Sequence, residues 1–148
     1  MRKTIFSLQE PEGPPSGLRG EILRTLTAAS EVLGFEPQLT MRGPLEAAVP
    51  DAVRADLIAV LGEALTNVIR HADAGQVEVQ IVVDALLHAV TLVVEDDGGG
   101  PADTGTAGYG TVNMRARAER LGGTFGLLAR PDTNGARLTW SVPLNCAG

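Results

Sequence analysis

The sequence lacks the features that mark several classes of protein. Its 148 residues include one cysteine, Cys146, so no intrachain disulfide can form and the chain fits a reducing compartment. No apolar run approaches the roughly 18–20 residues that a membrane-spanning helix needs. The segment Thr4–Leu8, after the basic Met1-Arg2-Lys3, is too short for the apolar part of a signal peptide. We therefore expect a soluble, cytoplasmic domain that makes no membrane contact.

Positive charge and aromatic residues are also scarce. Lys and Arg number 12 against 18 Asp and Glu, which gives a net charge of −6. This balance argues against nucleic acid as a partner, because nucleic-acid binding depends on cationic contacts to phosphate. Aromatic residues make up 3% and hydrophobic residues 44% of the chain, so its core must be aliphatic. The length predicts one domain with a sizeable core.

The most informative stretch is LIAVLGEALTNVIRHA, residues 57–72. Its apolar residues share one arc of a helical wheel, which predicts an amphipathic helix packed on the core. The members of that arc are Leu57, Leu61, Ala64, Leu65, Val68 and Ala72. Glu63, Asn67 and His71 recur every four residues and form a ridge, with Arg70 beside it. Such a ridge suits a metal–phosphate site, although taken alone it is also compatible with a solvated helix face.

Hydrophobic patterning predicts the remaining elements. A helix over 17–33 begins after a capping Ser16 and stops at Gly34, and the central helix starts near Asp51. Gly43-Pro44 begins a loop, and His88 is expected to be an ordinary strand residue. The other predicted elements are a strand over 35–41 that Pro37 places near a sheet edge, strands over 76–83 and 88–95 joined as a hairpin, a loop over 98–110, a helix over 111–121 with its arginines mostly outward, and strands over 124–129 and 136–144. This order predicts an α/β two-layer sandwich, a mixed β-sheet with three helices on one face.

Two glycine-rich stretches follow the central helix, VEDDGGG at 94–100 and GYGTVNMRARAERLGG at 108–123. The order of the three motifs resembles the ATP-binding domain of sensor histidine kinases, in the GHKL ATPase superfamily. In that family's terms E-A-L-T-N-V-I-R-H is similar to the N box, Asp96, Gly98 and Gly100 to the G1 box, and Gly108 and Gly110 to the G2 box. The run R-A-E-R-L-G-G resembles the nitrate-sensor and desaturase-sensor subgroup, with the mycobacterial dormancy-survival sensor kinases as the nearest match.

The resemblance implies a Bergerat-type ATP-binding fold and a role in a two-component system. Residues 1–16 would be a linker from an upstream dimerisation domain, and 17–145 the catalytic domain. The domain would bind Mg-ATP and pass the γ-phosphoryl group to a histidine outside this chain, for relay to a response regulator. Neither His71 nor His88 lies in the sequence context of such an acceptor. The full-length protein would be a homodimer.

The resemblance also assigns roles to residues at the three boxes. Asp96 would accept a hydrogen bond from the adenine 6-amino group, although it could instead cap the following loop. Asn67 would hold Mg²⁺ and Glu63 would act as general base or polariser. Arg70 and His71 would neutralise the β- and γ-phosphates, although His71 could equally be a satisfied helix histidine. Gly98 and Gly100 would let the backbone approach the base, while Gly108, Gly110 and Thr111 would form an anion site at a helix N-terminus.

Two departures from the family pattern affect nucleotide retention. Gly135-Ala136 stands where a Gly-Thr pair is usual, so a hydroxyl near the adenine is missing. Nine residues separate Gly98 from Gly108, which is too short for a long lid. We expect Asp103 on this short lid to pair with Arg70 and His71 and hold the empty pocket shut.

Two other functions fit the same motifs. One is a free-standing anti-sigma serine kinase, and the other is a non-catalytic module that senses nucleotide by changing shape. The carboxylate of Glu63 favours an enzyme over a pure binding module.

Overall fold

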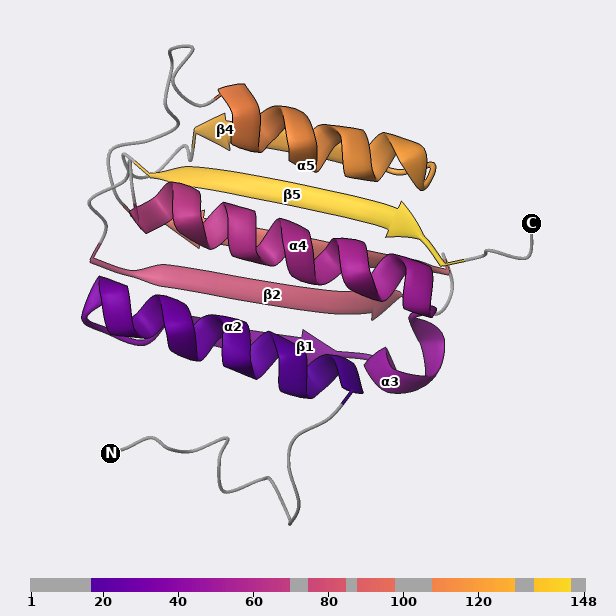
Figure 1. Cartoon of the computed structure of the whole chain (residues 1–148), viewed down its shortest axis with the longest axis horizontal. Helices are drawn as coiled ribbons and strands as arrows, with labels where there is room; N and C mark the ends of the chain where they lie inside the picture. The colour runs from indigo at the N-terminus through magenta and orange to yellow at the C-terminus, as the bar shows by residue number, and fades with distance from the viewer. Residues whose placement is uncertain (1–16, 70–74, 85–87, 98–107, 130–134, 145–148) are drawn as a thin grey trace.

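A layer of helices covers one face of a mixed sheet (Figure 1). The computed structural model describes residues 17–69, 75–84, 88–97, 108–129 and 135–144. Its elements are α2 (Gly17–Leu33), β1 (Gln38–Arg42), α3 (Leu45–Ala48), α4 (Asp51–Asn67), β2 (Val77–Asp84), β3 (Ala89–Asp96), α5 (Gly108–Arg120), β4 (Thr124–Ala129) and β5 (Ala136–Pro143). The predicted two-layer α/β architecture is confirmed, with α2, α4 and α5 as its three long helices.

The sheet has the strand order β1-β2-β3-β5-β4. The pair β1–β2 is parallel, whereas β2–β3, β3–β5 and β4–β5 are antiparallel. β2 and β3 pair from Val77↔Asp96 to Asp84↔Ala89, as expected for a hairpin. β1 lies at an edge, which agrees with the proline that precedes it.

The core lies between the sheet and the helices and is mainly aliphatic, as the composition predicts. Alternate residues of β2, β3 and β5 are buried, because successive strand side chains point to opposite faces. Two aromatic residues among those described join this core, Trp140 of β5, which is fully buried, and Phe125 of β4, which is 8% exposed. From the helices the core receives mainly Leu18, Ile22, Leu26, Ala29, Leu57, Val60, Leu61, Ala64, Leu65, Val68, Met114 and Ala118. No helix in the described part of the chain is both long and apolar enough to cross a bilayer.

Several predicted boundaries before α5 are wrong for local reasons. β1 begins at Gln38 and not at residue 35, because Pro37 has no N–H to contribute to a sheet. The expected loop after Gly43-Pro44 contains the single helical turn α3, with Leu45 buried. His88 is not a strand residue: it lies in the turn before β3 with a φ of 52°, a conformation found mainly in turns.

α5 begins three residues earlier than predicted, at Gly108, because the first N–H groups of a helix need no intrahelical acceptor and glycine is tolerated there. α5 ends just before the Leu-Gly-Gly sequence, because glycine readily takes the left-handed conformation that stops a helix. Gly122 has a φ of 84°, and the Gly123 N–H donates to the Ala118 carbonyl at 2.7 Å. A Cβ at Gly123 would overlap the backbone oxygen of Ser141 in β5. The C-terminal end of α5 is therefore seated directly on the sheet.

Replacing Gly62 by alanine should stabilise the domain. Gly62 lies inside α4, and a Cβ placed there would meet no atom within 4 Å. Alanine is the better helix former, so we expect the free energy of unfolding to rise by about 0.8–1 kcal/mol. Urea denaturation of the two proteins measures the difference, and a loss of stability would contradict this description of α4.

Candidate nucleotide site

The segments that carry the three motifs meet at one end of the sandwich. α4 and β3 both finish there, at Asn67 and Asp96, and β5 begins there at Ala136. Figure 1 shows α5 starting at this same end, the left end of the view. The topology therefore brings together residues that are far apart in the sequence, as the motif order requires.

α4 contributes a stripe of polar residues to this end. The predicted apolar arc is buried at Leu57, Leu61, Ala64, Leu65 and Val68. Glu63 and Asn67 are half-buried beside that arc, one turn apart. α4 ends at Asn67 and widens to a π turn at Val68 and Ile69, a distortion found often at functional sites. The two residues thus lie where a ligand at this end of the sheet would reach them.

Asp96 ends β3 and is one of two buried charged residues among those described, with 5% of its surface exposed. β3 therefore extends one residue beyond the predicted strand end at residue 95 and includes this carboxylate. Its surroundings are shaped by Gly135, which precedes β5. A Cβ at Gly135 would overlap the backbone oxygen of Asp96 and lie 2.6 Å from its carbonyl carbon. The Gly135 position is therefore needed for close packing of the two backbones, a role that the sequence pattern alone did not reveal.

Asp97 has a role that the sequence reasoning missed. Its Oδ1 accepts hydrogen bonds from the N–H groups of Gly75 and Gln76, at 2.8 and 2.9 Å. The Asp97 N–H in turn donates to the Gln76 carbonyl at 3.3 Å. This exposed carboxylate ties the entry to β2 to the end of β3. The sign of this role in the sequence is the second of two adjacent aspartates in the E-D-D-G run.

Several predicted site residues lie outside the described residues. They are Arg70, His71, Gly98, Gly100 and the lid residue Asp103. Gly108, Gly110 and Thr111 are described only as backbone at the start of α5. The roles suggested for all of them stay predictions.

A magnesium ion fits this end of the sheet only as a partner of phosphate. Among the described residues no three His, Cys, Asp or Glu side chains could together hold a metal ion. Mg²⁺ usually keeps several waters and takes one or two protein oxygens plus substrate phosphates. The side-chain oxygen of Asn67 is suited to that single-ligand role.

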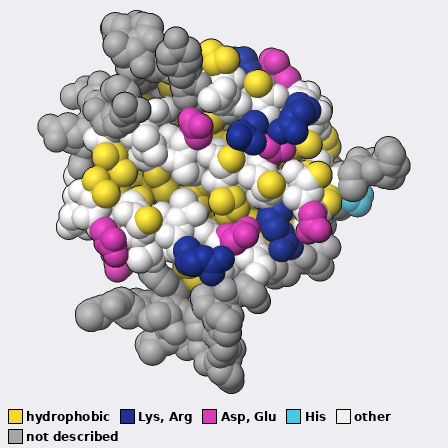
Figure 2. Space-filling model, viewed as in Figure 1, with side chains coloured by type: hydrophobic (Ala, Val, Ile, Leu, Met, Phe, Trp, Pro, Cys, Tyr) yellow, Lys and Arg dark blue, Asp and Glu magenta, His cyan; other side chains and the backbone are white. Residues whose placement is uncertain are grey.

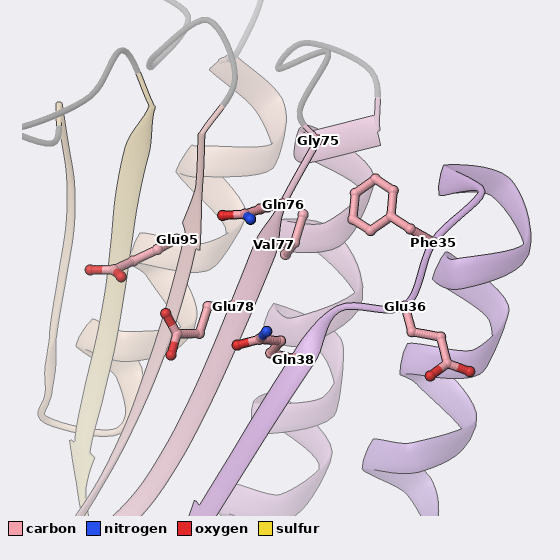
Figure 3. A pocket seen from close by; sticks show the side chains of 8 residues that line it. All are labelled: Phe35, Glu36, Gln38, Gly75, Gln76, Val77, Glu78 and Glu95. Atoms are coloured by element: carbon pink, nitrogen blue, oxygen red, sulfur yellow. The ribbon is translucent and has the colours of Figure 1, made fainter. Parts of the chain in front are cut away.

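A cavity of about 250 Å³ lies at the same end of the molecule, beside β1, β2 and β3 (Figure 3). Its lining includes Glu36, Glu78 and Glu95. Glu78 and Glu95 lie opposite each other in the β2–β3 ladder, and the guanidinium of Arg137 pairs with Glu95. Three carboxylates against one guanidinium would repel a triphosphate. This cavity is therefore not the nucleotide site.

A shallow groove of about 510 Å³ runs between α2 and α4 on the outer face of the helices. Figure 2 shows hydrophobic side chains across the middle of this face. Gly62, Leu65 and Thr66 of α4 line it, together with Ile69 of the π turn that follows. These residues lie on the α2 side of α4, away from α5, so the groove is separate from the stripe of Glu63 and Asn67.

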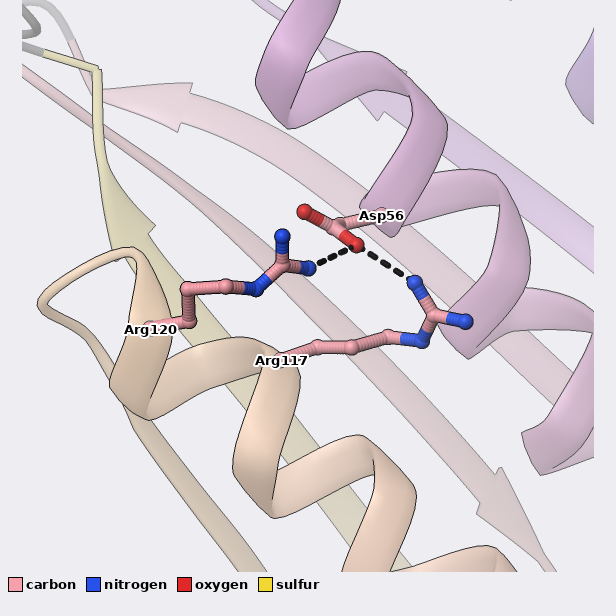
Figure 4. Close-up of polar contacts among 3 residues, drawn as sticks. All are labelled: Asp56, Arg117 and Arg120. Atoms are coloured by element: carbon pink, nitrogen blue, oxygen red, sulfur yellow. Dashed lines mark hydrogen bonds and ion pairs between the residues drawn. The ribbon is translucent and has the colours of Figure 1, made fainter.

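The α5 arginines lie mostly outward, as expected, but two of them also make a specific contact. Arg117 and Arg120 turn back towards α4 and bind one buried carboxylate, that of Asp56 (Figure 4). On the inner side of this helix Met114 and Ala118 are fully buried, and Leu121, just after its end, is partly buried. No motif in the sequence pointed to a role for Asp56.

The fold and these motifs define an ATPase of one known family. The family model described as "Histidine kinase-, DNA gyrase B-, and HSP90-like ATPase" matches residues 52–145, and the chain belongs to this family. It is 34% identical over 128 residues to the signal transduction histidine-protein kinase/phosphatase UhpB of Salmonella typhimurium, an alignment covering 80% of this chain and 25% of that protein. It is 35% identical over 111 residues to the sensor histidine kinase YxjM of Bacillus subtilis, covering 75% and 26%. The chain therefore spans about a quarter of the length of these curated relatives.

Solved structures share the fold. The histidine kinase domain of the blue-light activated kinase from Erythrobacter litoralis EL346 superposes with a TM-score of 0.64 at 21% identity, covering 94% of this chain and 68% of that one. The histidine kinase AdeS of Acinetobacter baumannii gives a TM-score of 0.64 at 20% identity, covering 86% and 64%. At these identities the likeness supports the architecture.

Proposed function

We propose that this chain is the ATP-binding catalytic domain of a two-component sensor histidine kinase. The observation that carries the proposal is the meeting of three features at one end of the sheet. They are the half-buried Glu63 and Asn67 on α4, the buried Asp96 at the end of β3, and the N-terminus of α5. A buried carboxylate, an amide oxygen and free helix N–H groups suit a base, a metal-bound phosphate and an anion, respectively.

ATP bound at this end supplies the phosphoryl group that is transferred, and the chain's own residues bind and orient it. In the proposed arrangement Asp96 accepts a hydrogen bond from the adenine amino group, and the α5 N-terminus meets the phosphates. Asn67 would hold Mg²⁺, which would neutralise charge on the phosphates. Glu63, one turn earlier on the same stripe, accepts a proton from or polarises the attacking imidazole.

Removing the charge of Asp96 tests the proposed adenine contact. We expect the 148-residue chain to bind Mg-ATP, and Asp96→Asn to weaken binding by about 1.5–3 kcal/mol because a charge-assisted hydrogen bond is lost. Calorimetry with ATP and with ADP measures the change, and the loss should be equal for both nucleotides because they share adenine. Asp84→Asn, a charge change at the far end of β2, is the control. Unchanged affinity of Asp96→Asn would remove this carboxylate from the site.

We also propose the two partners that the family resemblance implies, a phosphoacceptor domain and a response regulator. The acceptor would be a histidine on a dimerisation domain of the same protein, joined through residues 1–16 to the catalytic domain at 17–145, and the relay would end on a response regulator. The parent protein would be a cytoplasmically facing homodimer of the nitrate-sensor and desaturase-sensor subgroup, nearest to the dormancy-survival sensor kinases. The run R-A-E-R-L-G-G after the second glycine box supports that subgroup. Acid-labile phosphorylation of a longer chain that includes the preceding domain, and none of this chain alone, is the expected result.

A further inference from the structure

Asp56 and its two arginines form a junction between α4 and α5. Arg117 Nη1 donates to Asp56 Oδ1 at 2.5 Å, and Arg120 Nη2 donates to the same oxygen at 2.6 Å (Figure 4). The Asp56 side chain is 6% exposed, whereas those of Arg117 and Arg120 are 36% and 61% exposed. The junction therefore buries its acceptor and leaves its donors at the surface. Charge-assisted bonds of this kind are short and directional, so they fix the separation of the two helices.

The junction lies on the stripe of α4 that carries the proposed site. Asp56, Glu63 and Asn67 are separated by seven and four residues, close to two turns and one turn of helix. Because Asp56 contacts α5, this stripe faces α5 along its length. On α5, Gly110 and Arg117 are also two turns apart. The same helix face that binds Asp56 thus continues to the N-terminal end of α5.

The C-terminal half of α5 is held from two directions. The junction holds it against α4, and Gly123 seats the following chain on Ser141 of β5, where no Cβ fits. A helix that is held by two neighbouring elements near its C-terminus cannot tilt freely. The position of its N-terminus is then fixed as well. The position of the α5 N-terminus relative to Glu63 and Asn67 therefore depends on the junction.

From this geometry we infer that Asp56 is a positioning residue for nucleotide binding. It touches no ligand and acts through Arg117 and Arg120, by setting the width of the gap between α4 and α5 at the phosphate end. This inference rests on the proposed function, because it assumes that the α5 N-terminus meets the phosphates. It assigns a purpose to the paired arginines of R-A-E-R-L-G-G.

The test compares nucleotide affinity in variants of the 148-residue chain, using Mg-ATP in calorimetry well below each variant's melting temperature. Asp56→Asn and Arg117→Ala should each raise the dissociation constant about tenfold, and the double variant should be no worse than either single one. Arg115→Ala is the matched control: Arg115 lies on the same helix but stacks on Phe125, at 5.3 Å from the ring centroid, and should bind as the unmodified chain does. Leu26→Ala, which truncates a buried side chain of α2, controls for loss of stability and should leave affinity unchanged.

The outcomes separate this inference from the proposed function. If the unmodified chain binds no Mg-ATP, the proposed function fails and the inference fails with it. If the unmodified chain binds and Asp56→Asn binds equally well, the inference alone is overturned, and Asp56 is only a structural contact. Tighter binding by Asp56→Asn would also overturn it, because it would mean that the carboxylate withholds the arginines from phosphate. If Leu26→Ala lost as much affinity as Asp56→Asn, lower stability alone would explain the loss, and the inference would be overturned.

Discussion

Replacing Gly135 by alanine should strongly destabilise the domain. Among the described glycines outside the turn that follows α5, it is the position where alanine should cost the most stability. The new Cβ would overlap the backbone oxygen of Asp96 and lie 2.9 Å from the Cα of Asp97. These are backbone atoms at the paired ends of β3 and β5, so no side chain can rotate to make room. We expect a loss of about 3 kcal/mol in the free energy of unfolding, which for a domain of this size lowers the melting temperature by roughly 6–12 °C.

Gly126→Ala is the matched control for this change. Gly126 also lies in the sheet, in β4, but a Cβ there meets no atom within 4 Å. Alanine should therefore leave the stability unchanged or raise it slightly. Since Gly135 abuts Asp96, we also expect Gly135→Ala to weaken Mg-ATP binding at temperatures where it is folded. Thermal denaturation and calorimetry measure the two effects. Equal stability of the two variants would contradict this prediction. It would mean that the ends of β3 and β5 move apart to accommodate the new Cβ without loss of free energy of unfolding.

The fold was predictable from sequence because its elements have clear periods. The alternation in residues 76–83 and 88–95 gives two strands that the structure pairs antiparallel, with an error of one residue at each boundary. The apolar arc of the central helix is buried as predicted from Leu57 to Val68, while its last predicted member, Ala72, lies outside the described residues. The misplaced elements are those in which one residue overrides the pattern, such as Pro37 before β1 and the left-handed His88 before β3. In both cases backbone geometry, and not hydrophobicity, decides the boundary.

The candidate site was predictable only where a motif is local. Glu63 and Asn67 are close in sequence, so a helical period places them on one stripe. The junction of Asp56 with Arg117 joins residues 61 positions apart, and the contact of Gly135 with Asp96 depends on the pairing of β3 with β5. Such contacts follow from the packing of elements, which no local period encodes. A charged residue beside the apolar arc of α4 was the one available sign, since a buried carboxylate requires a partner.

The largest kinetic effect should come from Glu63→Gln in a longer protein that includes the phosphoacceptor domain. The change keeps the size of the side chain and removes its ability to take a proton. If Glu63 is the general base, phosphoryl transfer should slow by about 100- to 10,000-fold, the usual contribution of such a group. Mg-ATP affinity should stay the same, because the residue acts on the attacking imidazole and not on the bound nucleotide. Single-turnover labelling and calorimetry separate the two quantities.

Two further variants on the same protein decide whether the stripe on α4 is chemical or structural. Glu31→Gln makes the same change at an exposed position of α2 and should alter neither quantity. Asn67→Asp, one turn from Glu63, adds a charge next to the proposed metal ligand and should change the Mg²⁺ dependence of binding. If these residues take part in the chemistry, Glu63→Gln slows phosphoryl transfer without changing binding, whereas Asn67→Asp changes the Mg²⁺ dependence of binding. If both variants lose nucleotide binding to the same extent, the two residues maintain the shape of α4, and the base must be sought elsewhere.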